Sequence, residues 1–181
     1  MNRDGQKLSS LYLFRSTPEE DLEELCRAAR PLSFGTGDIV YRRGEPSDGA
    51  LLIVSGRLIA SISENGVSKD VGDSRAGEIV GEVGLFAIGT PRSADIRAGE
   101  ATRCLIIDQE LLRVLADNKA MIALEIHLLG SIARRIRSSG RSIQVLWKEA
   151  QMAQQRSKQE PGAGRPPTTI RDRLRSLFGG R

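Results

Sequence analysis

The sequence predicts an α+β protein in which an antiparallel β-roll or jelly roll of about eight strands lies between a short N-terminal helix and a long C-terminal helix. Apolar residues recur at helical spacing in residues 17–30. Short apolar runs broken by Gly, Asn and Asp fill residues 31–108, and helical spacing returns after them. The chain of 181 residues is long enough for one core with appendages.

These changes of pattern predict four segments. They are an N-terminal helical segment (1–30), a β-roll (31–118), a long C-terminal helix (119–157), and a linker with a basic tail (158–181).

The first expected helix covers residues 17–30. Thr17 is a suitable N-cap and Pro18 a suitable first helical residue, and four acidic residues follow in the opening turns, where they complement the helix dipole. Leu22, Leu25 and Cys26 then form an apolar stripe. This pattern is typical of an amphipathic helix packed on a core.

Turn residues divide the β region into strands. Asn65-Gly66 is a strong hairpin signal because both positions tolerate a positive φ, and a second turn is expected at Ser55-Gly56. Further strands are expected at the apolar runs 39–41, 51–54, 79–80 and 105–107. The number of runs suits a jelly roll or a barrel.

After a short helical piece through Leu111, Leu112 and Leu115, a long helix is expected over residues 119–154. Its apolar residues recur every seven positions, as in a coiled coil. The members of this seam are Ile122, Leu129, Ile136 and Ile143, with Ile132, Ser139 and Leu146 three places on. The seam predicts a parallel homodimer, and the alternative is that it packs on its own β domain. Trp147 is expected either at the helix interface or as a lid over a ligand.

The composition argues against an enzyme. Cys26 and Cys104 have no metal-ligand spacing and fall in apolar patterns, which favours buried structural residues over a redox pair. The single histidine, His127, leaves no cluster for a metal and no nucleophile with its base, so we expect no catalytic residues and no metal. Neither a run of eighteen apolar residues nor a signal-peptide pattern is present, and a cytoplasmic location is therefore expected.

Charge is distributed unevenly along the chain. Residues 1–131 carry 15 Lys and Arg against 20 Asp and Glu, a net −5, whereas residues 132–181 carry 12 against 3, a net +9. The basic end suits nucleic acid, an anionic membrane surface or an acidic partner, or is simply a solvated surface. After a Pro/Gly linker, Thr168 to Phe178 has the spacing of a small basic amphipathic helix.

The stretch 81–94, GEVGLFAIGTPRSA, has the parts of an anion pocket. Gly81 and Gly84 permit close backbone approach, a helical turn from Glu82 to Phe86 would aim N–H groups at an anion, and Arg92 offers a two-pronged donor for phosphate oxygens. A carboxylate at Glu82 fits such a site when the ligand also presents hydroxyl groups, as a ribose does. Phosphate and ribose together indicate a nucleotide.

This stretch resembles the phosphate-binding cassette of the cyclic nucleotide-binding domain family, whose pattern is G-E-x-x-L followed after a short gap by R-S/A-A. The form GE-x-GLF-xx-G-xx-RSA-xx-RA is most similar to the bacterial catabolite activator (Crp/Fnr) branch. Gly35 and Gly37, Gly44-Glu45, the Val54-Ser-Gly-Arg-Leu58 hairpin and Ala133-Arg-Arg-Ile136 support the resemblance, which covers about Phe14 to Val145.

The resemblance implies roles for individual residues. Glu82 would accept a hydrogen bond from the ribose 2′-hydroxyl, Arg92 would pair with the cyclic phosphate of cAMP or cGMP, and Ser93 would add contacts to it. Gly81 and Val83 would contribute backbone groups. Aligning the Ala-Arg-Arg-aliphatic mark places Ser139 where the activator branch reads the purine, although Gly140 stands where that branch offers a second hydroxyl. Ser139 is equally well explained as a small residue at a helix contact.

The resemblance also has a limit. Crp-type regulators continue with a winged helix-turn-helix domain, and the residues after Ala150 are too few to form one. The expectation is a stand-alone cyclic nucleotide receptor of bacterial signal transduction, coupled through its long helix to an unknown protein partner. The alternatives are a DNA-associated regulator that acts through the basic tail and binds DNA with a steep salt dependence, an interaction module with an empty pocket, and a receptor for another nucleotide such as a cyclic dinucleotide.

Overall fold

The structure is a computed structural model that describes residues 3–64 and 66–159, with the side chains of the last helix described only in part beyond Arg134. The chain divides into two compact units, residues 1–131 and residues 132–181. All of the β structure lies in the first unit, which is where the candidate site lies.

Fourteen elements follow one another along the described chain. Three helical elements come first: α1 (Arg3–Ser9), the 3₁₀ turn η1 (Tyr12–Phe14) and α2 (Glu19–Ala28). Six strands follow: β1 (Pro31–Phe34), β2 (Ile39–Tyr41), β3 (Ala50–Ser55), β4 (Arg57–Glu64), β5 (Val67–Arg75) and β6 (Ile79–Val80). The remaining elements are α3 (Val83–Phe86), β7 (Asp95–Ala98), β8 (Thr102–Ile107), α4 (Gln109–Val114) and α5 (Lys119–Gln159).

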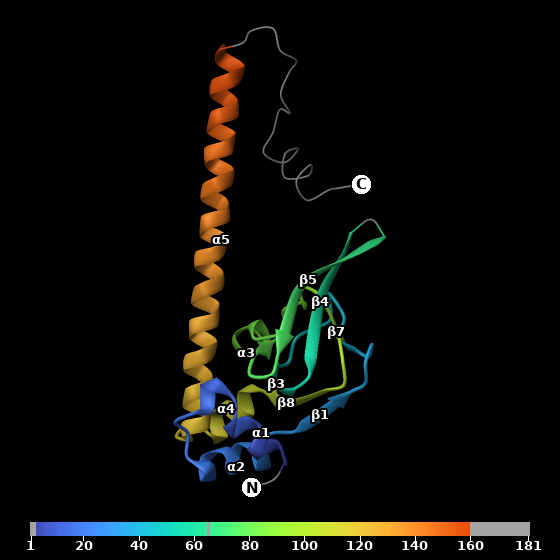
Figure 1. Cartoon of the computed structure of the whole chain (residues 1–181), viewed down its shortest axis with the longest axis vertical. Coiled ribbons are helices and arrows are strands. Elements are labelled where there is room, and N and C mark those ends of the chain that lie inside the picture. Colours follow the sequence, from blue (N-terminus) through green and yellow to red (C-terminus); the bar gives the residue numbers. More distant parts are fainter. Residues whose placement is uncertain (1–2, 65, 160–181) are drawn as a thin grey trace. The chain divides into compact units, whose positions relative to one another are not determined.

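The eight strands form two four-stranded sheets, and every strand pair in them is antiparallel (Figure 1). One sheet has the order β1-β8-β3-β6, and the other has the order β2-β7-β4-β5. The predicted α+β jelly roll of about eight strands with flanking helices is therefore confirmed.

The hydrophobic core joins the two sheets. Its cluster takes Leu51, Ile53 and Cys104 from the first sheet and Leu58, Ile96 and Ala98 from the second, all of them buried. Burial of these apolar side chains is the main stabilising contribution to such a fold. Buried and half-buried residues alternate along β7, which reflects a strand with one face on this core.

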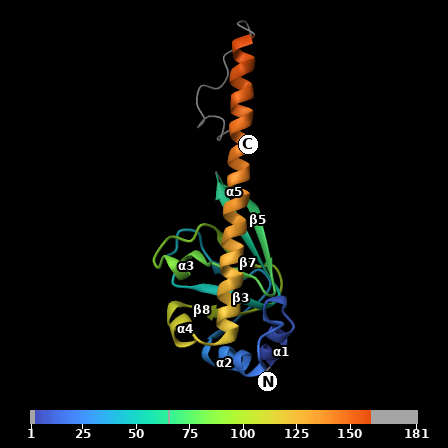
Figure 2. The ribbon, with the colours of Figure 1, turned by 90° about the vertical axis from the view of Figure 1, so that its left-hand side faces the viewer.

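The helices α1, α2 and α4 lie beside the first turns of α5 (Figures 1 and 2). Helix α1 is fixed to β8 by Asp4, whose two carboxylate oxygens accept from Arg103 Nε and Nη2 at 2.7 and 2.6 Å. These hydrogen bonds hold the pKa of Asp4 below its usual value. The buried amide of Asn118 joins the start of α5 to α2 by donating to the Asp21 carbonyl and to Glu24.

Several local predictions are confirmed and one is wrong. Gly56 and Gly66 have positive φ angles of 92° and 80° at the two predicted turns, and α5 begins at Lys119 as expected. Thr17 is not the N-cap of the second helix, because α2 begins at Glu19 and Pro18 occupies that position. Pro18 has no side-chain oxygen to cap with, and the acidic first turn stabilises this end by its charge.

The prediction that both cysteines are buried is confirmed for Cys104 and is wrong for Cys26. Cys104 is buried and Cys26 half-buried, and both are free. Burial raises the pKa of Cys104 to about 12 and that of Cys26 to about 11, so both remain thiols rather than reactive thiolates at neutral pH. In the described part of the chain, no helix combines the length and apolar character that a membrane crossing needs.

Candidate functional site

Backbone hydrogen bonds join the end of the predicted anion-binding stretch, residues 89–92, to the loop after β2. Arg92 N–H donates to the Glu45 carbonyl at 2.8 Å, and the Arg92 carbonyl accepts from Gly44 N–H at 2.9 Å. Two further bonds, from Ser47 N–H to the Thr90 carbonyl and from Gly89 N–H to the Ser47 carbonyl, continue this pairing. The loop after β2 therefore fixes the backbone position of Arg92 without the help of a ligand.

The Arg92 side chain points inward and is 6% exposed. Its Nη1 donates to the Gly49 carbonyl at 2.8 Å and to the Gly81 carbonyl at 3.2 Å, and its Nη2 lies 3.3 Å from an Asp48 carboxylate oxygen. The guanidinium also stacks over the Tyr41 ring, 3.7 Å from its centroid. Arg92 Nε is buried and has no hydrogen-bond partner. A buried donor without a partner is costly, which marks this atom as a site for an acceptor.

The glycines of the motif make room for that side chain. Gly81 has a φ of +80°, and a Cβ at this position would collide with Arg92 Nη1. A Cβ on Gly84 would lie 2.8 Å from the Gly49 carbonyl and 3.2 Å from Arg92 Nη1. The close packing of Gly81 and Gly84 explains why these positions carry no side chain.

The other predicted site residues occupy different environments. Glu82 is 5% exposed and stands directly before α3, whereas Val83 and Ser93 are exposed. Within this turn, Gly84 and Leu85 N–H groups donate to the Gly81 and Glu82 carbonyls.

Ser139 lies in α5, and its side chain is outside the described part of the structure. The expected tail helix from Thr168 to Phe178 also lies outside the described residues. The structure thus brings Gly81 into contact with Arg92, and the buried Glu82 follows Gly81 directly in the chain.

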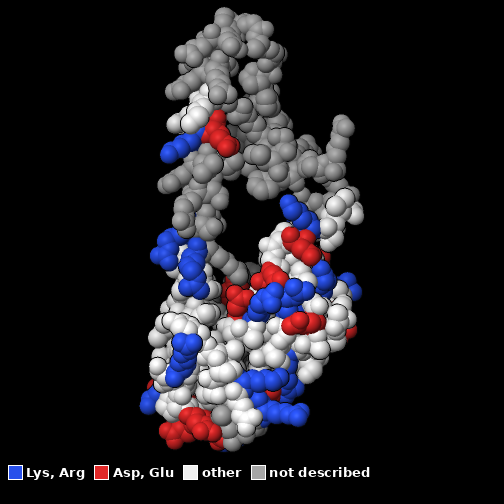
Figure 3. Space-filling view, viewed as in Figure 1, with Lys and Arg blue, Asp and Glu red and all other residues white. Residues whose placement is uncertain are grey.

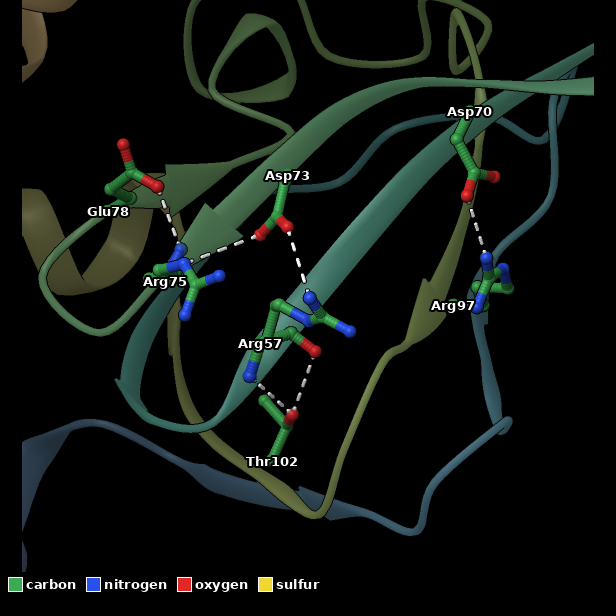
Figure 4. A network of polar contacts seen from close by, with 7 residues as sticks. All are labelled: Arg57, Asp70, Asp73, Arg75, Glu78, Arg97 and Thr102. Atoms are coloured by element: carbon green, nitrogen blue, oxygen red, sulfur yellow. Dashed lines mark hydrogen bonds and ion pairs between the residues drawn. The ribbon is translucent and has the colours of Figure 1, made fainter.

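Arginines on the outer face of the β2-β7-β4-β5 sheet are arranged differently. Basic and acidic side chains lie next to each other over this sheet (Figure 3). Arg57 and Arg75 both contact Asp73, at 3.4 and 3.8 Å, and Arg97 contacts Asp70 at 2.9 Å (Figure 4). Arg57 Nε is also buried without a partner, but Arg57 Nη1 pairs with the Asp73 carboxylate, whereas Arg92 Nη1 donates to two neutral carbonyls.

Three partners of Arg92 were not identified from the sequence. Tyr41, Asp48 and Gly49 surround the guanidinium but precede it by more than forty residues. Tyr41 reaches the site because β2 pairs with β7, with Tyr41 opposite Ile96. The spacing of residues along the sequence does not predict a contact between residues so far apart.

The donor set fits a small anionic nucleotide better than a metal ion. A buried guanidinium with a partnerless Nε suits a phosphate oxygen, and a buried carboxylate ten residues earlier suits a hydroxyl donor. Among the residues that the structure describes, no three His, Cys, Asp or Glu side chains form a group that could hold a metal ion.

Comparison with protein families identifies the β region of the chain. A family model described as "Cyclic nucleotide-binding domain" matches residues 31–119, a range that holds all eight strands and the cassette.

Two relatives illustrate the range of similar proteins. A cGMP-dependent protein kinase from Eimeria tenella is 34% identical over 113 residues, which are 62% of this chain and 11% of the kinase. A CRP-like cAMP-activated global transcriptional regulator from Mycobacterium tuberculosis is 25% identical over 167 residues, covering 86% of this chain and 73% of the regulator. The chain therefore spans only about a tenth of the kinase.

Solved structures agree with the fold. A cyclic nucleotide-binding domain from Methylobacillus flagellatus superposes with a TM-score of 0.63 and 24% identity, covering 77% of this chain and 83% of that domain.

Proposed function

The chain belongs to the cyclic nucleotide-binding domain family through residues 31–119, and from this premise we propose that it is a receptor for cAMP or cGMP. The observation that supports the proposal most directly is the buried Arg92 guanidinium with its partnerless Nε. Such a donor is complementary to the single negative charge of a cyclic phosphate. The protein acts by binding, as a regulatory module located in the cytoplasm.

We assign the contacts to the ligand residue by residue. Arg92 pairs with the cyclic phosphate through Nε, and Ser93 adds its exposed hydroxyl. The buried Glu82 carboxylate accepts from the ribose 2′-hydroxyl, and Gly81 and Val83 contribute backbone groups. Ser139 contacts the purine.

The two relatives do not distinguish cAMP from cGMP as the ligand. One is named for cGMP and the other for cAMP, and both align with this chain over the region of the cassette. We propose that binding changes the arrangement of α5 and thereby its contact with a protein partner, because a ligand shifts an equilibrium only by its differential affinity for two states.

A homodimer through α5 is part of the proposal. Ile122, Ile126 and Leu129 in the first turns of α5 are 41%, 66% and 62% exposed. A row of exposed apolar residues on one helix suits association with a second helix of the same kind. Farther along α5, the side chain of Trp147 is 62% exposed and is available to such a partner.

A transcriptional role is the second candidate. It is favoured by the alignment with the CRP-like regulator, which extends over 86% of this chain, and by the net charge of +9 in residues 132–181. In this second reading, the basic segment 132–181 or a partner would supply the contacts to DNA.

Thermal unfolding with saturating cAMP and with saturating cGMP tests the receptor function. A ligand that binds only the folded state at a hundred times its Kd adds about 2.7 kcal/mol to the free energy of unfolding. We expect a clear rise in Tm with one of the two nucleotides and none in Arg92→Ala.

Arg97→Ala is the matched control, because Arg97 is an exposed arginine of β7 paired with Asp70. We expect this variant to keep the ligand-dependent rise. If neither nucleotide raises the Tm of the wild-type protein, the proposed function is wrong.

A further inference from the structure

Tyr41 is the one aromatic neighbour of Arg92 that the structure places over its guanidinium. The guanidinium carbon lies 3.7 Å from the ring centroid. The other arginine stacked on a tyrosine in the described residues, Arg15 over Tyr12, is more distant at 5.0 Å, and Tyr12 is 79% exposed. A cation over an aromatic face gains more when the pair is shielded from water, and here Arg92 is buried and Tyr41 half-buried.

The contacts of Arg92 leave one direction for a ligand. Gly49 and Gly81 carbonyls take Nη1, and Asp48 lies beside Nη2. The Tyr41 ring covers a face of the guanidinium. The N–H groups that remain are that of Nε and the second one of Nη2, and both lie in the guanidinium plane, so an anionic ligand has to approach within that plane.

We propose that Tyr41 is a positioning residue for the ligand anion: its ring holds the guanidinium plane of Arg92 so that Nε meets a phosphate oxygen. The inference rests on the proposed function and adds a residue outside the cassette motif. Without the ring, the guanidinium can tilt toward the space that the ring vacates. Binding would then have to reorder the side chain at a cost in free energy.

The surroundings of Tyr41 support this role. A Cβ on Gly81 would lie 3.3 Å from Tyr41 Cε2, so the absence of a side chain at Gly81 gives the ring its place. Burial, opposed in part by the charge of Arg92, raises the pKa of the Tyr41 hydroxyl to about 12. The phenol is therefore neutral at physiological pH and does not compete with the ligand as an anion.

Titration calorimetry of three variants tests the inference with cAMP or cGMP, whichever stabilises the wild type. Tyr41→Leu removes the aromatic face and is expected to weaken binding roughly two- to thirty-fold. Tyr41→Phe keeps the ring and is expected to bind within about two-fold of the wild type. Tyr12→Leu is the matched control, because it removes the exposed stack on Arg15 and should leave binding unchanged.

A second readout needs no ligand. In the nuclear magnetic resonance spectrum of protein labelled with ¹⁵N-arginine, the Nε–H signal of Arg92, assigned from Arg92→Lys, should carry a ring-current shift from Tyr41. The shift should persist in Tyr41→Phe and vanish in Tyr41→Leu.

The outcomes separate the two proposals. If the wild type binds a nucleotide but Tyr41→Leu binds it as tightly, or Tyr41→Phe weakens binding as much as Tyr41→Leu, the positioning role is overturned. If the wild type binds neither nucleotide, the proposed function fails, and with it the role of Tyr41 toward a ligand. The Arg92 signal then still decides whether the stack exists.

Discussion

Gly81 shows how closely the backbone fits around the guanidinium of Arg92. Its φ of +80° lies in the left-handed region, where a residue with a Cβ loses about 1–2 kcal/mol. The added Cβ would also meet Arg92 Nη1. Gly81→Ala should therefore lower the free energy of unfolding by more than the backbone cost alone and abolish the ligand-dependent rise in Tm. Urea unfolding with and without nucleotide measures both effects.

Gly66→Ala separates these two contributions. Gly66 has the same φ of +80°, at the turn between β4 and β5, and nothing lies within 4 Å of its added Cβ. This control should lose only about 1–2 kcal/mol and keep ligand binding. Equal losses in the two variants, with binding intact in both, would contradict the crowding at Arg92.

The site residues divide into those that sequence spacing reveals and those that it cannot reveal. Gly81, Glu82 and Arg92 stand within one short motif, so the spacing alone predicts that they belong to one site. Tyr41 and Asp48 lie on or near another strand and reach Arg92 only through the antiparallel pairing of the roll. Tyr41 falls within an ordinary strand pattern, and nothing in that pattern tells a core aromatic residue from one stacked on arginine.

At the scale of elements, Asn118 joins the start of α5 to α2. Its Oδ1 accepts from the N–H groups of Ala120 and Met121 at 2.9 and 3.2 Å, which caps the helix. Its Nδ2 donates to the Asp21 carbonyl at 3.1 Å and to Glu24 at 2.8 Å. The side chain is buried and its hydrogen-bonding atoms are all engaged, so the contact holds two helices together.

Asn118→Ala removes the cap and the contact with α2 at once. We expect it to lower the free energy of unfolding by about 2–4 kcal/mol, because a cap contributes about 1 kcal/mol and the loss of buried partners adds to it. Chemical denaturation followed by circular dichroism measures the change.

Asp108→Ala provides the comparison for a cap alone. Asp108 caps α4 through one bond of 2.8 Å to Leu111 N–H. It should cost about 1 kcal/mol. A loss at Asn118 no greater than that at Asp108 would mean that the contact with α2 contributes nothing.

Strands were predictable from the sequence where apolar residues recur along them, and they were missed where nearly all of their residues are polar. The strand β5 has the sequence VSKDVGDSR, and eight of its nine residues are exposed at the edge of a sheet. A strand exposed at the edge of a sheet does not need alternating apolar residues. The sequence therefore indicated β5 only through the Asn65-Gly66 turn that precedes it.

At the scale of the whole molecule, the fold class could be predicted because patterning changes twice along the chain, from helix to strand and back. Assembly could not be settled in this way, since an apolar seam on a helix packs equally well on its own domain or on a second copy. In the structure, Leu129 of that seam is 62% exposed, which favours a second copy as the partner.

Leu129→Glu tests the homodimer. A carboxylate placed in an apolar helix seam opposes a second carboxylate from the partner helix and should convert the protein to monomers. Sedimentation velocity at several concentrations measures the change in mass. Val67→Glu is the control, because Val67 is 64% exposed on β5 and its replacement should leave the dimer intact. A wild-type protein that sediments as a monomer would refute the assembly.

The exposed Trp147 has a practical consequence. It is the only tryptophan of the chain, so fluorescence excited at the red edge of indole absorption comes from this one position on α5. Emission from an indole in water has a longer wavelength than emission from an indole covered by protein. The emission wavelength and the anisotropy of this intrinsic fluorescence therefore report, without any added label, whether a nucleotide or a second chain covers this part of α5.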